Sequence, residues 1–182
     1  MEPRIQNGFL RAIIFIPIWF VTLALFMTLT STLLMFGSGV DMADENAVQA
    51  LFEVSFDSPI MLFLTASQVV ASFLALWLAT KFIDRKPLMS IGLSVKDKAN
   101  EMLIGLGFAL AFIGGLFFIL WLLGAITISG YVGFKPGVFI VSMMLFLAAF
   151  DEEIIFRGYV LNNMMDSSSR WVALAGSSAL FA

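Results

Sequence analysis

Residues 151–157, Asp-Glu-Glu-Ile-Ile-Phe-Arg, interrupt a stretch that otherwise has the composition of a membrane span. Thirteen residues without a charge precede them, from Val138 to Phe150. An Asp or Arg side chain at the centre of a membrane helix costs about 2.5–3.5 kcal/mol. Four ionisable side chains within seven residues therefore predict a functional site inside a membrane-spanning helix.

The composition indicates a membrane protein. Hydrophobic residues make up 60% of the 182 residues, against about 45–50% in soluble domains. Cysteine and histidine are both absent, which excludes disulfides and thiolate metal sites and removes the commonest metal ligand and general base. The basic residues form no large patch with interleaved aromatics, so we expect no nucleic-acid partner.

The apolar runs predict an all-α, polytopic transmembrane helix bundle. A run of about 20 residues is needed to cross a bilayer. Four runs meet this length: Phe9–Phe36, Ile60–Ile83, Met102–Ile128 and Gly137 to about Leu161. A fifth begins at Trp171 and reaches Ala182, too short to cross. We therefore expect four full spans plus the start of a fifth, in the amino-terminal part of a larger protein.

The loop charges predict the orientation of this multi-pass integral membrane protein. Arg4 and Arg11 precede the first span, and the loop 37–59 carries five acidic residues and no Lys or Arg. The loop 81–98 carries five basic residues, and the third loop only Lys135. Because cytoplasmic loops are enriched in Lys and Arg, the amino terminus is expected in the cytoplasm. The acidic cluster then falls in the cytoplasmic third of the bilayer, after about 20 Å of helix.

The charged side chains of the cluster differ in their expected surroundings. Glu153 and Arg157 are four residues apart on one helix face, so we expect them to pair. Glu152 is rotated by about 100° from Glu153 and has no evident partner. Asp151 either reaches the headgroups or bonds locally. A buried carboxylate without a partner takes up a proton or a cation, and such a group can activate water.

These observations leave three readings of the cluster open. One is an ion pair that joins two helices or marks the membrane interface. Another is a carboxylate for transport or proton relay, because ionisable residues within spans mark ion pathways. The last is a hydrolytic site.

The cluster resembles a known motif. Glu152-Glu153-x-x-x-Arg157, followed by Gly158 and Tyr159, is similar to the first motif of the CPBP intramembrane proteases. This family comprises the type II CAAX prenyl endopeptidases and the bacteriocin-processing Abi proteins. The resemblance is strongest from about residue 92 to residue 182 and only generic for the first two spans. It divides the chain into an amino-terminal transmembrane pair with a basic loop, 1–90, and the start of the protease core, 91–182.

The family's second motif, Phe-x-x-x-His, lies on the next helix. Phe181 falls at the position of its phenylalanine, and the histidine would be position 185, three residues past the end of the sequence. The resemblance implies that Glu152 polarises or deprotonates the attacking water together with that histidine. Glu153 and Arg157 would shape and neutralise the catalytic site. A divalent metal such as zinc is possible, and the 182 residues alone are expected to be inactive.

The resemblance implies an intramembrane endopeptidase. Its partners would be the lipid bilayer and a peptide or protein substrate, either a CAAX-type tail or a leader or bacteriocin peptide. The short loops favour a bacterial cytoplasmic membrane. The alternatives are a non-catalytic bacteriocin self-immunity membrane protein, and a small proton-coupled transporter with Glu152 as its proton carrier. The oligomeric state is not predicted.

Overall fold

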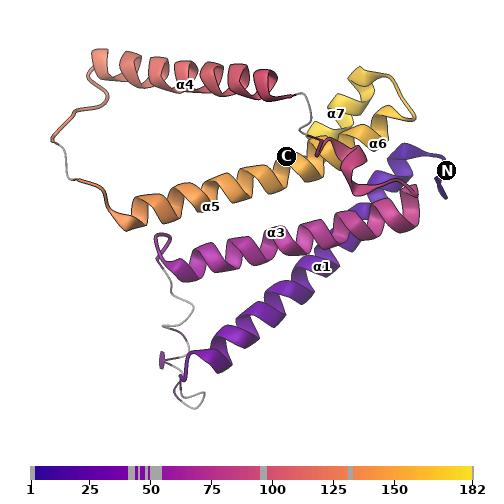
Figure 1. The fold of residues 1–182 in the computed structure, drawn as a ribbon, viewed down its shortest axis with the longest axis horizontal. Helices are drawn as coiled ribbons and strands as arrows, with labels where there is room; N and C mark the ends of the chain where they lie inside the picture. The colour runs from indigo at the N-terminus through magenta and orange to yellow at the C-terminus, as the bar shows by residue number, and fades with distance from the viewer. Residues whose placement is uncertain are drawn as a thin grey trace. The chain divides into compact units, whose positions relative to one another are not determined.

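The computed structural model describes residues 3–40, 44, 46, 47, 49, 55–94, 98–130 and 133–181. Every regular element in these residues is helical, which confirms the all-α class (Figure 1). The elements are α1 (Gly8–Gly37), α3 (Pro59–Ala79), η1 (Thr80–Asp84), η2 (Leu88–Ile91), α4 (Ala99–Leu122), α5 (Pro136–Glu152), η3 (Glu153–Leu161), α6 (Asn162–Met165) and α7 (Arg170–Phe181). Of these, η1 and η3 are π-helical and η2 is a 3₁₀ turn.

Three helices in the described ranges are long and apolar enough to cross a membrane: Gly8–Gly37, Pro59–Asp84 and Ala99–Leu122. These helices coincide in position with the first three expected spans. The fourth expected span does not meet the same criteria of length and apolar composition. Helix α5 ends at Glu152 after 17 residues, and the π-helix that continues it carries charged residues of the cluster. Four full spans therefore remain a prediction.

The chain forms two compact units, Met1–Leu93 with Lys135–Ala182, and Ser94–Phe134. The second unit contains α4, which has no buried residue. This helix ends at Leu122, before the expected Ile128. Gly124 adopts a left-handed conformation with φ 71°. The amide of Ala125 donates to the Leu120 carbonyl at 3.0 Å, a Schellman arrangement that satisfies the last carbonyls of the helix.

Side-chain caps set where the first two spans begin. The Asn7 side chain accepts hydrogen bonds from the amides of Phe9 and Leu10 at 2.9 and 3.2 Å. The Ser58 hydroxyl accepts one from the amide of Ile60 at 3.0 Å, and Pro59 occupies the first turn of α3. Both caps satisfy amides that have no partner within their helix.

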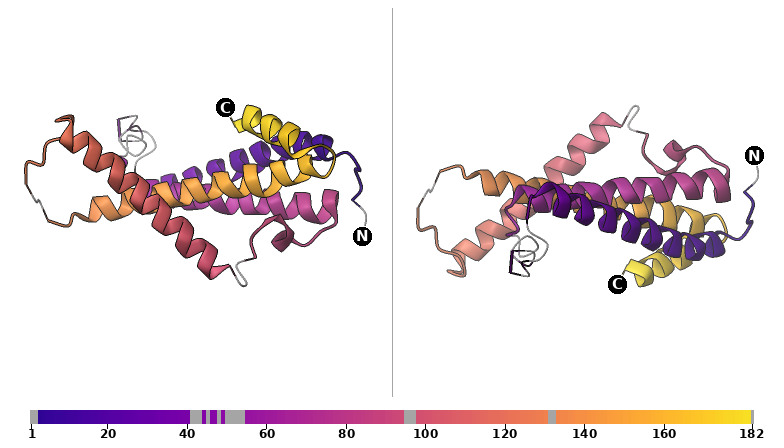
Figure 2. Two further views of the ribbon diagram at one scale, coloured as in Figure 1. Left: turned by 90° about the horizontal axis from the view of Figure 1, so that it is seen from above. Right: turned by 90° about the horizontal axis from the view of Figure 1, so that it is seen from below.

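Helix α3 packs against both α1 and α5 in the first unit (Figure 1, Figure 2). Ala71, Ala75 and Ala79 lie one turn apart on α3 and are fully buried. Their small side chains allow neighbouring backbones to approach closely. In the same core, the ring centroids of Phe15 and Tyr159 lie 4.4 Å apart between α1 and η3. This packing holds the charged cluster beside the first two spans.

An ion-pair network joins α1 to Asp84 at the end of η1 and to Asp166 directly after α6. Arg11 is 1% exposed, and its guanidinium contacts Asp84 at 3.2 Å and Asp166 at 2.9 Å. Lys86 contacts the same oxygen of Asp166 at 3.1 Å. The sequence reading placed Arg11 ahead of the first span as a topological charge. The structure instead places it inside α1, because two carboxylates from distant segments compensate its charge.

Candidate functional site

The charged cluster lies where an α-helix becomes a π-helix. Helix α5 ends at Glu152, and η3 continues without a break from Glu153 to Leu161. Most π-helical segments are single turns inserted in α-helices, and they are frequent at functional sites. The nine-residue η3 segment is longer than one turn and contains both Glu153 and Arg157.

Asp151 is the buried carboxylate of the cluster. It is 2% exposed and accepts a hydrogen bond from the Ser72 hydroxyl at 2.9 Å. That hydroxyl in turn accepts a hydrogen bond from Trp19 Nε1 at 2.9 Å, and Gln68 is a second side-chain partner of Asp151. Asp151 therefore bonds across helices and not within its own, and it links α5 through α3 to α1.

Glu152 is exposed at the surface of the protein. Within the described part of the chain it has no hydrogen-bond partner and no oppositely charged neighbour. The physical reason is the helical rotation of about 100° per residue, which turns Glu152 away from α3 when Asp151 faces it. The Glu152 carboxylate is therefore available to bind a ligand or accept a proton.

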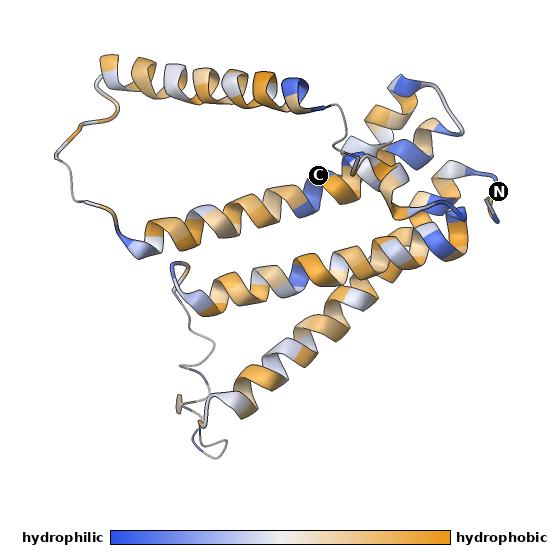
Figure 3. Cartoon of the chain, viewed as in Figure 1, coloured by the Kyte–Doolittle hydropathy of each residue, from blue (hydrophilic) through white to orange (hydrophobic). Residues whose placement is uncertain are grey.

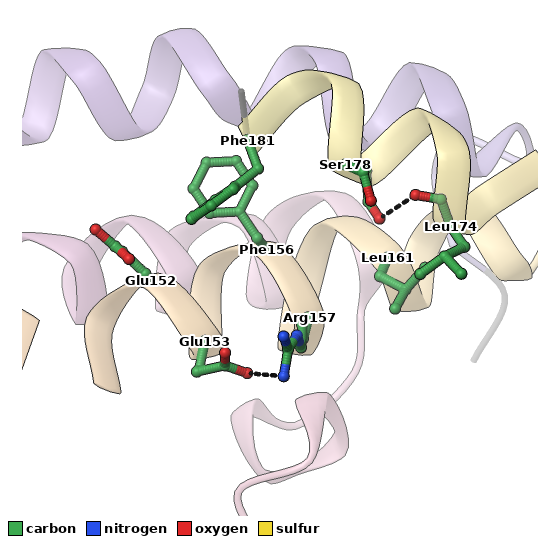
Figure 4. Close-up of a pocket in the computed structure, with 9 residues that line it drawn as sticks. Glu152, Glu153, Phe156, Arg157, Leu161, Leu174, Ser178 and Phe181 are labelled. Atoms are coloured by element: carbon green, nitrogen blue, oxygen red, sulfur yellow. Dashed lines mark hydrogen bonds and ion pairs between the residues drawn. The ribbon is translucent and has the colours of Figure 1, made fainter. Parts of the chain in front are cut away.

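Glu153 and Arg157 form the expected pair. Glu153 Oε2 and Arg157 Nη1 are 3.0 Å apart, and both side chains project on the same side of η3 (Figure 4). The Glu153 and Arg157 side chains are 52% and 75% exposed. The pair therefore lies at the protein surface, where Arg157 neutralises the charge of Glu153 locally.

A pocket of about 190 Å³ brings the three predicted site residues together. Glu152, Glu153 and Arg157 line it from the α5–η3 helix, and α7 supplies the opposite side (Figure 4). The rings of Phe156 and Phe181 meet edge to face across it, with centroids 5.0 Å apart. The residue identified by the position of the second motif thus lies directly across from the first motif.

Gly158 has a role that the residue pattern alone did not reveal. A Cβ at this position would lie 2.8 Å from the Ile91 carbonyl oxygen. Only glycine therefore lets the η2 turn approach η3 this closely. The sequence signal for this close approach was the glycine directly after Arg157. The motif contains this glycine but does not reveal its structural role.

The described residues do not fit a zinc ion by themselves. No group of three or more His, Cys, Asp or Glu side chains among them is placed to hold a metal. Catalytic zinc sites use three protein ligands, and Glu152 and Glu153 supply two carboxylates of which one is paired with Arg157. No chemical step is therefore assigned to a metal in this chain.

Comparison with known proteins identifies the segment that contains this pocket. Residues 133–182 match the family model described as Rce1-like, type II CAAX prenyl endopeptidase Rce1-like. This match confirms the resemblance to the CPBP family. It covers α5, η3, α6 and α7, and so includes Glu152, Glu153 and Arg157. No curated protein and no solved structure matches the chain. The CAAX protease match and the apolar helices together support an intramembrane protease as the general class.

Proposed function

We propose that this protein is an intramembrane endopeptidase that hydrolyses peptide bonds with a water activated by Glu152. The observation that carries the proposal is the pocket between η3 and α7. There the Glu152 carboxylate, which has no partner in the described residues, lines the same pocket as Phe181, within the segment that matches the CAAX protease family. Its substrates are CAAX-type tails or leader and bacteriocin peptides, which reach the pocket from the membrane.

The proposed chemistry follows from what each side chain has available. Glu152 accepts a proton from water while the water oxygen attacks the scissile carbonyl carbon. The proton then passes to the leaving amine as the carbon–nitrogen bond breaks. The resemblance assigns half of the base to a histidine beyond residue 182. Arg157 offsets the charge of Glu153, so that only one carboxylate at the pocket remains free to act as a base.

The proposed membrane arrangement adds a fourth span from Gly137 to about Leu161. It places the amino terminus in the cytoplasm of a bacterium, and divides the chain into residues 1–90 and 91–182. The alternation of acidic and basic loops supports the orientation. Asp151 is already hydrogen bonded to Ser72, so this carboxylate has a partner inside the bundle.

The test is Glu152→Gln in the protein encoded by the complete gene, assayed by mass spectrometry on prenylated tails and leader peptides. Glutamine keeps the shape but removes the base, so we expect cleavage to fall by at least about 10²-fold. Glu101→Gln is the matched control, because Glu101 belongs to the other unit and its one ion pair among the described residues is with Lys98. Cleavage by the Glu152→Gln protein at the unaltered rate would reject the catalytic assignment and favour a transport or self-immunity role.

A further inference from the structure

A second pocket lies at the carboxy-terminal end of α3, away from the charged cluster. Its volume is about 430 Å³, and its wall includes Trp77, Lys81, Arg85 and Lys86. Ligand sites in proteins usually have about 300–1,000 Å³. The pocket occupies the end of the candidate span Pro59–Asp84, so it lies at a membrane face whichever way the chain is oriented. Figure 3 shows hydrophilic residues gathered where α3 ends.

The charges around this pocket are not balanced by the protein. Arg11 forms ion pairs with both nearby carboxylates, Asp84 and Asp166. Asp166 also forms an ion pair with Lys86. Lys81 and Arg85 have no acidic partner in the described ranges. Two exposed cations therefore remain beside a pocket at the membrane face, where they attract an anion.

The backbone at Arg85 is held in an unfavourable conformation. Its φ of 54° is the one positive value for a residue other than glycine in the described chain. The amide of Lys86 donates to the Thr80 carbonyl at 3.0 Å, which closes the turn after η1. This turn brings Arg85 and Lys86 to the wall of the pocket. Such strained residues cluster at ligand sites, where the surrounding structure maintains them.

The aromatic wall of the pocket suits a lipid. Trp77 lies in the last turn of α3, and Lys81 Nζ is 4.3 Å from the centre of its ring. Tryptophan near the end of a span sits at the level of the headgroups, with its apolar ring toward the acyl region. The Lys81 ammonium lies over the Trp77 ring as a cation–π contact, which holds this charge beside the pocket. The pocket thus combines an apolar wall with a cationic rim.

We propose that this pocket binds the phosphate of an anionic membrane lipid. Lys81 and Arg85 are the phosphate ligands, and Trp77 contacts the glycerol and the start of the acyl chains. Lys86 contributes less because Asp166 neutralises it. The proposal uses no residue of the η3–α7 pocket, so it holds whether the protein is a protease, a transporter or a binding protein.

The test is native mass spectrometry of the purified chain in a non-ionic detergent, titrated with phosphatidylglycerol and, separately, with phosphatidylcholine. We expect one tightly held phosphatidylglycerol and no comparable phosphatidylcholine. The double substitution Lys81→Gln with Arg85→Gln should weaken the binding of phosphatidylglycerol about 25-fold, because each basic residue contributes about fivefold to the affinity. The matched control, Lys135→Gln with Arg170→Gln, also removes one lysine and one arginine but lies outside this pocket, so it should retain the lipid.

Three outcomes would overturn the proposal. Equal weakening by the two double variants would indicate diffuse attraction to the whole chain. Equal retention of the two lipids would show that the pocket does not distinguish lipids by the charge of their headgroup. Displacement of the lipid by inorganic phosphate at similar concentration would make this a site for free phosphate.

A measurement on the unaltered protein covers the case in which the Lys81→Gln, Arg85→Gln variant does not fold, as judged by circular dichroism. Added salt should release phosphatidylglycerol and leave phosphatidylcholine retention unchanged, because the site depends on charge. Retention of phosphatidylglycerol that is insensitive to salt would also overturn the proposal.

Discussion

Ser72 Oγ donates a 2.9 Å hydrogen bond to Asp151 Oδ2, the carboxylate immediately before the two glutamates of the charged cluster. Both side chains are buried, and they come from helices 79 positions apart in the sequence. Because Asp151 is held toward α3, Glu152 is turned toward the η3–α7 pocket. The orientation of the proposed base thus depends on a hydrogen bond that involves neither the pocket nor the base.

Ser72→Ala should lower the thermal stability of the purified protein in detergent. It removes one of the two side-chain partners of Asp151 and leaves Trp19 Nε1 without its acceptor, which costs about 1–3 kcal/mol. Ser142→Ala is the control, because Ser142 is exposed on α5 and its hydroxyl donates to a carbonyl of its own helix. Equal melting temperatures for the two variants would show that the Ser72–Asp151 bond does not hold α3 to α5.

Glu153 and Arg157 should show a small but measurable coupling. We expect Glu153→Gln and Arg157→Met each to lower stability slightly in detergent, and the double variant to recover part of the loss. The coupling free energy should be about 0.3–0.5 kcal/mol, as for exposed pairs four apart on a helix. A double-mutant cycle from thermal melts measures it. Strictly additive losses would mean that the two side chains do not meet in solution.

Gly158→Ala should destabilise the protein by about 1–3 kcal/mol, because the added methyl group is forced against the Ile91 carbonyl and η2 has to move. Gly107→Ala on α4 is the matched control. A Cβ there meets nothing within 4 Å, and alanine is the better helix former. Thermal melting of both variants measures the difference. A neutral Gly158→Ala would show that η2 is not packed against η3.

Asp166 should make stability depend on acidity. Its partial burial alone would raise the pKa of Asp166, but hydrogen bonds from Arg11 and Lys86 outweigh burial and lower that pKa below its usual value. A lowered pKa in the folded state stabilises the protein above the unfolded pKa of about 3.9, and the contribution disappears as the pH falls through the folded value.

The variant Asp166→Asn lacks this contribution. Its melting temperature should therefore lie furthest below that of the unaltered protein near neutral pH, and the two should converge as the pH falls below about 4. Asp44→Asn, at an exposed aspartate with no basic partner in the described chain, should follow the unaltered protein throughout. If the difference in melting temperature between Asp166→Asn and the unaltered protein stayed constant with pH, the pH-dependent stabilisation would not come from Asp166.

The orientation predicts opposite labelling of two serines. The chain has no cysteine, so Ser38→Cys and Ser94→Cys each introduce a single thiol. In intact cells a membrane-impermeant thiol reagent should label Ser38→Cys, in the loop without basic residues, and not Ser94→Cys. The reverse pattern would invert the topology and move the charged cluster to the other leaflet.

The residue sequence by itself determined the all-α class, the three long apolar helices and the ion pair within one helix. The first three apolar helices were predictable because apolar length is a local property of the sequence. The pairing of Glu153 with Arg157 was predictable for the same reason, since four-residue spacing places two side chains on one face. The motif predicted the position of Phe181 but did not predict its contact with Phe156.

Only the tertiary structure decided which side chains are buried. The burial of Asp151 and the exposure of Glu152 depend on which face of α5 meets α3, and nothing within residues 151–157 specifies that face. The burial of Arg11 likewise required Asp84 and Asp166, which lie 73 and 155 positions away. Burying a charge is favourable only with its partners in place, and those partners are brought together by the packing of whole helices.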